Sequence, residues 1–283
     1  MLVPADDAPE LETARARRLE HAFARGAGHG LLRLGAAEVG AALPPIFAYW
    51  REVGRRYVTS LCTRPDIEEQ RTAILPPAAQ ELESLAAAAP PMLGAEYLTP
   101  TVLRRLWDEL GEAFAIELGE SGATVQDFLR SLDPAWNVVG RVHFNLAENR
   151  RDTEAPFAFL ATYTSRLSAH GKAQHQPLGQ ALREYAGARN KERLLSLLLP
   201  VQRAAERCAW LKDMVEAGEI FHPLRWSADD AFRLLADVAE LEHAGVVLRM
   251  PATWRAGRPP RPRVTATLGG KPPSGLGTDA LLD

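Results

Sequence analysis

Large apolar residues recur every three or four positions along much of the first half of the chain. The pattern is clearest at residues 46–61 and 101–118, so each stretch predicts an amphipathic helix with one face against a core. Residues 11–25 predict a further helix with several basic positions. Residues 68–89 predict a helical region that two prolines interrupt. We therefore expect the N-terminal part to be mostly helical.

Two stretches near the middle of the chain alternate apolar and polar residues, as a half-buried strand does. They cover residues 138–146 and 157–163, and the polar link at 148–154 favours an antiparallel hairpin between them. Earlier in the chain, the glycines at 26–30 predict a break in helical structure. The short apolar run at 31–34 that follows them predicts an isolated strand.

Helical periodicity returns at residues 178–186 and 191–210, where Pro200 predicts a kink or a break. Helix-forming residues dominate the composition, and aromatic residues make up only 7% of it, which favours helices over strands. We therefore predict an α+β fold that is mostly α-helical. It would consist of a helical N-terminal part, a central β-hairpin with helices, and a C-terminal winged-helix-like module.

The C-terminal module is predicted from residues 219–268. Ser227 stands where a helix N-cap is expected, with acids in the first turn after it. A second short helix should end near Gly245, and residues 246–248 and 264–268 predict the two strands of a hairpin. Two helices followed by a hairpin is the layout of a winged helix. An ordinary helical hairpin beside an ordinary β-hairpin fits the same pattern.

Candidate DNA-binding residues fall into two groups. The stretch between the two predicted C-terminal strands carries five arginines and no acid: Arg249, Arg255, Arg258, Arg261 and Arg263. A cationic hairpin tip suits phosphate contacts. The second group is Arg166, Lys172 and His175, in a polar segment that follows the strand predicted at 157–163. For both groups the alternative is a solvated surface, since arginine also improves solubility and reflects GC-rich coding.

The net charge of −3 hides an asymmetry along the chain. Residues 1–140 contain 13 basic and 20 acidic residues, a net charge of −7, whereas residues 141–283 contain 20 basic and 16 acidic residues, a net charge of +4. The first part therefore has no electrostatic reason to seek nucleic acid, and the second part has a mild one.

The sequence lacks the motifs of nucleotide hydrolysis and of nucleophilic catalysis. The Gly-Lys pairs at 171–172 and 270–271 are not followed by the Ser or Thr of a phosphate-binding loop, and no Gly-x-Ser-x-Gly elbow occurs. Neither the histidines nor the two cysteines have the spacing of a metal site. We therefore expect no catalytic residue, metal or cofactor in this chain.

The two ends of the chain bear on location and completeness. Residues 1–10 contain acids and prolines in place of an apolar signal core, and no apolar run reaches transmembrane length. We therefore expect a cytoplasmic chain without a membrane partner. At the other end, a Gly/Pro-rich link leads into the apolar residues 280–282, which predicts that the natural polypeptide continues past Asp283.

Four short stretches together resemble a known family: 155–167 (APFAFLATYTSRL), 171–179 (GKAQHQPLG), 218–226 (GEIFHPLRW) and 245–251 (GVVLRMP). They resemble the region N-terminal to the motor in bacterial SWI/SNF-type DEAD/DEAH-box helicase-like proteins, including the helicase-associated domain. The resemblance covers residues 136–283 well and the earlier part more loosely.

The resemblance implies that the parent protein is a DNA-dependent ATPase or translocase whose motor lobes lie beyond Asp283. ATP and Mg²⁺ would then bind only in that motor, since this chain has none of the ATPase motifs. The implied partners are DNA, the downstream motor of the same polypeptide and other subunits of a phage-defence system. The predicted domains are an acidic helical domain (1–134), an α/β segment (135–210), the winged-helix-like module (211–268) and a linker (269–283).

Two functions of different classes remain open from the sequence. The chain could be a non-catalytic accessory region that engages DNA, or positions it for the motor, through the two cationic groups. It could instead be a protein-interaction or autoinhibitory module, because the acidic residues 1–140 would avoid DNA and could cover a basic cleft.

Overall fold

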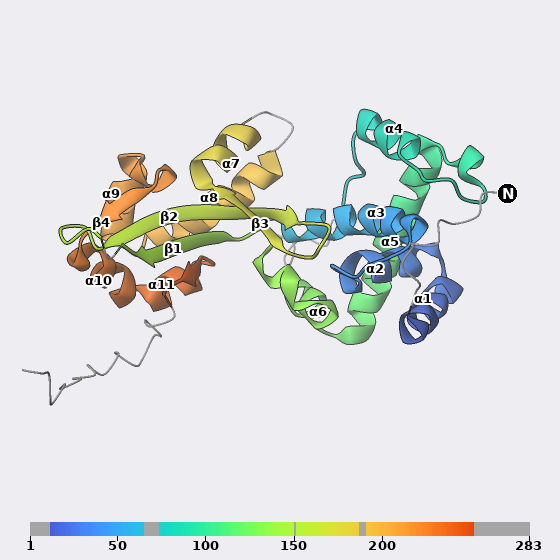
Figure 1. Cartoon of the computed structure of the whole chain (residues 1–283), viewed down its shortest axis with the longest axis horizontal. Coiled ribbons are helices and arrows are strands. Elements are labelled where there is room, and N and C mark those ends of the chain that lie inside the picture. Colours follow the sequence, from blue (N-terminus) through green and yellow to red (C-terminus); the bar gives the residue numbers. More distant parts are fainter. Residues whose placement is uncertain (1–11, 65–73, 150, 187–190, 252–283) are drawn as a thin grey trace, which may run out of the picture. The chain divides into compact units, whose positions relative to one another are not determined.

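The computed structural model describes residues 12–64, 74–149, 151–186 and 191–251. These residues form eleven α-helices and one five-stranded mixed sheet (Figure 1). The predicted fold class, α+β and mostly α-helical, is confirmed. Within the described ranges, no helix combines the length and the apolar character that crossing a membrane requires.

The N-terminal part is helical. Its elements are α1 (Thr13–Arg25), α2 (Ala27–Ala37), α3 (Pro45–Cys62), α4 (Ala79–Ala87), η1 (Ala95–Tyr97), α5 (Pro100–Ser121), α6 (Val125–Leu132) and η2 (Pro134–Val138). The helices predicted at 46–61 and 101–118 are confirmed as α3 and α5. Their apolar faces meet in a core where Tyr57, Trp107 and Phe114 pack edge to face. Trp136 of η2 joins this core and donates a 2.8 Å hydrogen bond to the Ala36 carbonyl.

The strand predicted at 31–34 is wrong, because these residues lie inside helix α2. The break predicted at 26–30 is confirmed at Gly26, which separates α1 from α2, but Gly28 and Gly30 lie inside α2 at close helix contacts. A Cβ on Gly28 would lie 2.1 Å from the Glu109 carbonyl oxygen, and one on Gly35 would lie 2.3 Å from the backbone of Gly54 on α3. Glycine is therefore required for packing at these positions, and the helix continues through it.

The five strands form one sheet with the order β3-β2-β1-β5, and β4 also pairs with β2. Their bounds are β1 (Val142–Glu148), β2 (Phe157–Leu167), β3 (Ala173–Pro177), β4 (Leu224–Trp226) and β5 (Val247–Arg249). The predicted antiparallel pairing of the two central strands is confirmed, with Phe144 opposite Ala161. Strand β2 is longer than predicted, and its end at Leu167 reaches the core of the N-terminal helices.

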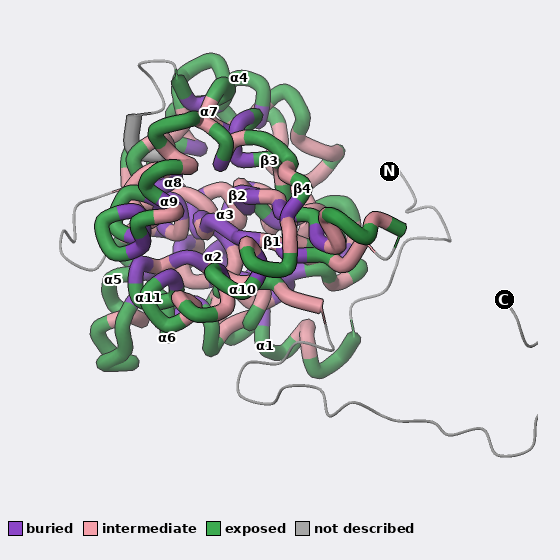
Figure 2. Tube along the Cα trace, turned by 90° about the vertical axis from the view of Figure 1, so that its left-hand side faces the viewer, coloured by how far each residue is buried: buried purple, intermediate pink, exposed green. Residues whose placement is uncertain are grey.

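The remaining helices follow the central strands. They are α7 (Leu178–Tyr185), α8 (Lys191–Ala205), α9 (Ala209–Glu216), η4 (Glu219–Phe221), α10 (Ala228–Ala236) and α11 (Val238–His243). Helix α8 continues through Pro200, so of the two predicted alternatives the break is wrong and the kink stays a prediction; the chain leaves the helix before Cys208. Figure 2 shows buried positions concentrated on β1, β2, α2 and α3, and exposed positions on the outer helices.

Helices α7, α8 and α9 cover one face of the sheet. Tyr163 of β2 lies 3.1 Å from the Ser196 hydroxyl of α8, and its ring contacts Tyr185 of α7. Farther along β2, Phe159 stacks on Trp226 of β4 with ring centroids 4.1 Å apart, and Trp226 meets Trp210 of α9. Because side chains alternate along a strand, the neighbouring residues of β1 and β2 point to the opposite face.

The C-terminal elements follow the predicted order. Ser227 caps α10 in a capping box with Asp230, and Gly245 ends the second helix at φ +94°, so both predicted signals are confirmed. Strand β5 pairs in parallel with β1. Its predicted hairpin partner at 264–268 lies outside the described residues, so the winged-helix module stays a prediction. The domain boundaries at 134, 210 and 268 also stay predictions.

Candidate nucleic-acid interface on the sheet

The face of the sheet opposite α7–α9 is polar. His143 and Asn145 of β1 lie on it, beside Thr162 of β2 and His175 of β3. Arg249 of β5 stands opposite Asn145. His143 and Thr162 are buried, whereas His175 and Arg249 are exposed at the two sides of the face. The face therefore passes from a buried polar centre to exposed groups that could contact a ligand.

Three side chains at the centre of this face form a hydrogen-bonded chain. The Thr164 hydroxyl lies 3.0 Å from Nε2 of His143 and 2.6 Å from Nδ1 of His175. The two imidazole rings meet edge to face with their centroids 4.9 Å apart. Thr164 thus joins a histidine of β1 to a histidine of β3 across β2.

The donors in this hydrogen-bonded chain of side chains can be assigned from the carbonyl near His143. Nε2 of His143 also lies 3.4 Å from the Val138 carbonyl oxygen, which can only accept, so Nε2 carries the proton. The Thr164 hydroxyl is then free to donate to Nδ1 of His175. Nδ1 of His143 is buried and has no hydrogen-bond partner among the described residues.

Both histidines are held neutral. Burial, opposed in part by the hydrogen bond to Val138 and helped by the nearby Arg249, His175 and Arg141, lowers the pKa of His143 to about 4. Burial and Arg249 also lower the pKa of His175. At neutral pH these histidines therefore contribute hydrogen bonds to the face, and its positive charge comes from arginine.

Asn145 and Arg249 form the side of the face next to β5. Nδ2 of Asn145 donates to the Leu160 carbonyl at 2.8 Å and to the Thr162 hydroxyl at 3.0 Å. These bonds fix the amide against β2. The Arg249 side chain is exposed, and no ion pair is found for it within the described residues. Its guanidinium is therefore available to an anion from solvent.

Arg166 and Lys172 lie at the other end of β2. Arg166 donates from Nε to the Gln174 side chain of β3 at 2.8 Å, just past a register shift in the strand pairing. Lys172 lies in the turn between β2 and β3, where Gly171 has φ +72°. Both side chains are exposed, and neither forms an ion pair with any acid that the structure describes. The segment predicted as a polar loop is therefore a strand, a turn and a strand.

We call Arg166, Lys172 and Arg249 the strand cations. The strand pairing sets the distance between them. Arg249 is level with Leu160 on β2, six residues before Arg166. At about 3.3 Å per residue, this separates the two by roughly 20 Å along the strand. Arg249 is thus close enough to His175 to lower the pKa of that histidine, but it lies well away from Arg166 and Lys172.

The sequence did not single out His143, Thr164 or Asn145. Alternation along β1 placed His143 and Asn145 on the polar side of the strand, and this pattern was the signal in the sequence that could have identified them. The pairing with β2 and β3 was needed to show that His143 meets His175. The predicted contact residues Arg255, Arg258, Arg261 and Arg263 lie outside the described residues.

The described side chains do not indicate a metal site. Nowhere in the described ranges do three His, Cys, Asp or Glu side chains gather as metal ligands. The polar face offers imidazole, hydroxyl, amide and guanidinium groups, which suit phosphate oxygens and base edges better than a cation.

Comparison with known proteins gives one match. Residues 219–283 match a family model described as SNF2 Helicase protein, and this segment includes η4, β4, α10, α11 and β5. Neither the curated proteins nor the solved structures contain a match. The C-terminal part of the chain is therefore similar to a family of SNF2-related helicase proteins.

Proposed function

We propose that this chain is a non-catalytic accessory region of a bacterial SWI/SNF-type DNA-dependent ATPase, and that it engages or positions DNA for the motor. The family match over residues 219–283 supports the association with a helicase. The single observation that carries DNA engagement is the row of strand cations, which are exposed and lack an acidic partner within the described residues. A role in phage defence belongs to this proposal through the resemblance of the sequence.

The spacing of the strand cations fits an extended polyanion. The roughly 20 Å between Arg249 and Arg166 along the strand spans several phosphates of a nucleic-acid backbone. A guanidinium binds phosphate oxygens through two parallel hydrogen bonds. Contacts of this kind give affinity without sequence choice, which suits a region that holds DNA for a motor.

The polar face adds neutral contacts between the cations. The exposed His175 can offer its outer ring nitrogen to a phosphate or a base edge, because its Nδ1 is already bonded to Thr164. The arginines predicted at 255–263 would extend the positive charge past Arg249. ATP and Mg²⁺ would belong to the motor, and no step of their chemistry is assigned to residues of this chain.

The test is fluorescence anisotropy of the intact chain with labelled single-stranded, double-stranded and forked DNA at several salt concentrations. Three phosphate contacts on duplex DNA would give a slope of about −2.7 for log K against log salt, and further contacts from 255–263 would steepen it. The absence of binding even at low salt would contradict the proposal.

The second candidate, a protein-docking or autoinhibitory module, is favoured by the net charge of −7 over residues 1–140. Cutting the chain at residue 140 would not separate the two functions. Trp136 and Leu167 lie in one core with the N-terminal helices, so the cut would expose that core. Point substitutions in the intact chain avoid this problem. Autoinhibition predicts that neutralising exposed acids of the helical part tightens DNA binding more than the added charge alone explains.

A further inference from the structure

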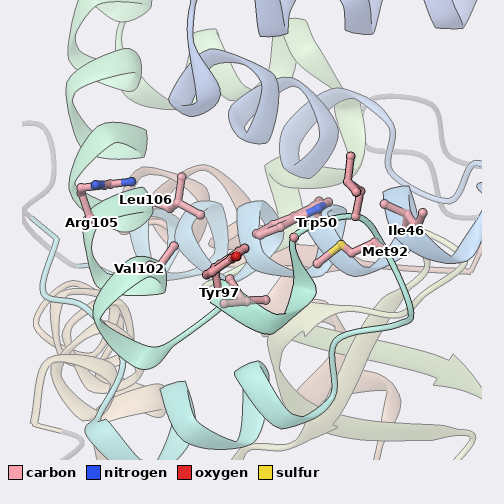
Figure 3. Close-up of a pocket in the computed structure, with 10 residues that line it drawn as sticks. Ile46, Trp50, Met92, Tyr97, Val102, Arg105 and Leu106 are labelled. Atoms are coloured by element: carbon pink, nitrogen blue, oxygen red, sulfur yellow. The ribbon is translucent and has the colours of Figure 1, made fainter.

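An apolar pocket opens on the N-terminal helices, far along the chain from the strand cations. Its volume is about 560 Å³, within the range of roughly 300–1,000 Å³ that ligand pockets have. Trp50 of α3, Met92, Leu98, and Val102 and Leu106 of α5 line it (Figure 3). The pocket is therefore built from large apolar side chains of segments that meet in the fold.

Exposed apolar side chains stand beside this pocket. Leu93 is 105% exposed and Tyr97 is 74% exposed, and both also border the pocket. Ile46 on the α3 side is 39% exposed. Apolar residues that cluster at full exposure around a hollow mark an interaction surface, whereas scattered single ones do not. Leu93 and Tyr97 project beside a hollow that could accept side chains of their kind.

A surface with both a projection and a matching hollow can pair with a second copy of itself. In a two-fold interface the same patch appears on both sides, so the projection of each copy enters the hollow of the other. Tyr97, Trp50, Met92 and Arg105 around the pocket are of the residue types enriched at interfaces. Leu93 and Tyr97 would thus bury in the pocket formed by Trp50 and Leu106 of the second copy.

The charges on α5 favour the same arrangement. Arg105 borders the pocket, and the half-buried Glu109 and the exposed Glu112 follow it on the next turns of the helix. Arg105 is 72% exposed and its own Glu109 is a loose partner at 3.6 Å. Two α5 helices packed antiparallel would place the Arg105 of each copy against the acids of the other. The side of α5 that begins at the pocket is therefore complementary to itself in charge.

We propose that this surface joins two copies of the chain about a two-fold axis, with Leu93 and Tyr97 of each copy in the apolar pocket of the other. The interface uses none of the strand cations. Dimerisation can therefore be tested independently of DNA binding. A dimer would present two DNA-engaging faces.

Sedimentation velocity of the intact chain over a range of concentrations tests this proposal. The expected result is a species of twice 31.0 kDa that dissociates on dilution. Leu93→Asp should return the chain to 31.0 kDa or weaken association at least ten-fold, because it places a charge in the apolar pocket. Since Leu93 is fully exposed in one copy, the melting temperature measured at low concentration should stay unchanged.

Two controls make the test specific. Phe232→Asp removes another exposed aromatic residue, on α10, and should leave the dimer intact. Arg105→Glu alone and Glu109→Arg alone should each weaken association, and the double variant should restore it, because the interchange recreates the pairing across the axis. A wild-type chain that stays at 31.0 kDa at every concentration would overturn the proposal, as would a Leu93→Asp variant that remains dimeric.

Discussion

The arginines of the N-terminal helices and those of the sheet face different surroundings. Several arginines of the helices pair with acids: Arg15 with Glu38, Arg25 with Glu120 and Arg56 with Glu81 across elements, and Arg105 with Glu109 within α5. The strand cations Arg166, Lys172 and Arg249 are exposed, and within the described residues they have no such partner. A phosphate that approaches one of these paired arginines also meets its acid, whereas one that approaches a strand cation does not.

The pairing of individual cations says more about where an anion can bind than the net charges of the two halves do. The sequence gives −7 for residues 1–140 and +4 for residues 141–283, a modest contrast. Only the structure tells which cations are already paired. Because exposed ion pairs add about 1 kcal/mol or less to stability, the helical pairs are not what holds that part together. We attribute its stability to close helix packing, and the first prediction tests this.

Gly35→Ala should have the largest effect on stability. Its Cβ would lie 2.3 Å from the Gly54 backbone, and α2 and α3 would have to separate, at a cost of about 3 kcal/mol. Gly119→Ala is the matched control, because this glycine lies on α5 with nothing within 4 Å of its Cβ position. It should gain up to about 1 kcal/mol from helix propensity. Urea unfolding gives the free energy of unfolding of both variants. Equal changes in the two would contradict the role assigned to close packing.

The buried His143 of the sheet should make the free energy of unfolding depend on pH. Its pKa is about 4 in the fold against an ordinary 6.5, so the unfolded chain takes up a proton first as pH falls. The stability that this histidine contributes is complete above about pH 6.5 and is lost towards pH 4, with a loss of about 2 kcal/mol at pH 5.

His143→Gln removes this titration while it keeps a donor for Thr164 and the Val138 carbonyl. Urea unfolding of both proteins at pH 7.5 and pH 5.0 gives the comparison. The wild type should lose about 2 kcal/mol more than the variant between these two values. Parallel losses would mean that His143 is not held neutral by its surroundings.

Ser227→Ala should have the smallest effect of the three. Ser227 caps α10 and accepts from the Asp230 amide, while the Asp230 carboxylate accepts from the Ser227 amide. Loss of the cap should cost about 1 kcal/mol in thermal or urea unfolding. Ser227→Asn keeps a capping side chain and should recover most of the loss. A variant with alanine as stable as the wild type would show that the cap is not needed.

Alternation and capping signals predicted the parts of the fold that depend on local sequence. The strand pair β1–β2, the helices α3 and α5 and the cap at Ser227 are examples. Local patterns failed where a distant partner decides the structure. The glycines of α2 resemble helix breakers until α3 and α5 are seen against them, and the polar segment Ala173–Pro177 becomes a strand because β2 offers it an edge.

The candidate site divides in the same way. Composition pointed to Arg166, Lys172, His175 and Arg249, because side-chain chemistry can be read from single residues. The hydrogen-bonded chain through Thr164 to His143 depends on strand register, which a polar pattern does not reveal. The absence of ion pairs around the strand cations, judged on the described residues, also required the fold.

The most direct measurement compares two variants that lose the same charge. In one, Arg166, Lys172 and Arg249 are all changed to Ala. In the other, Arg18, Arg25 and Arg130, which are exposed on the N-terminal helices and paired with acids, are changed to Ala. The slope of log K against log salt for duplex DNA should fall by nearly three in the first variant and hardly change in the second. Equal changes in the two slopes would contradict the proposal that the sheet carries the DNA contacts.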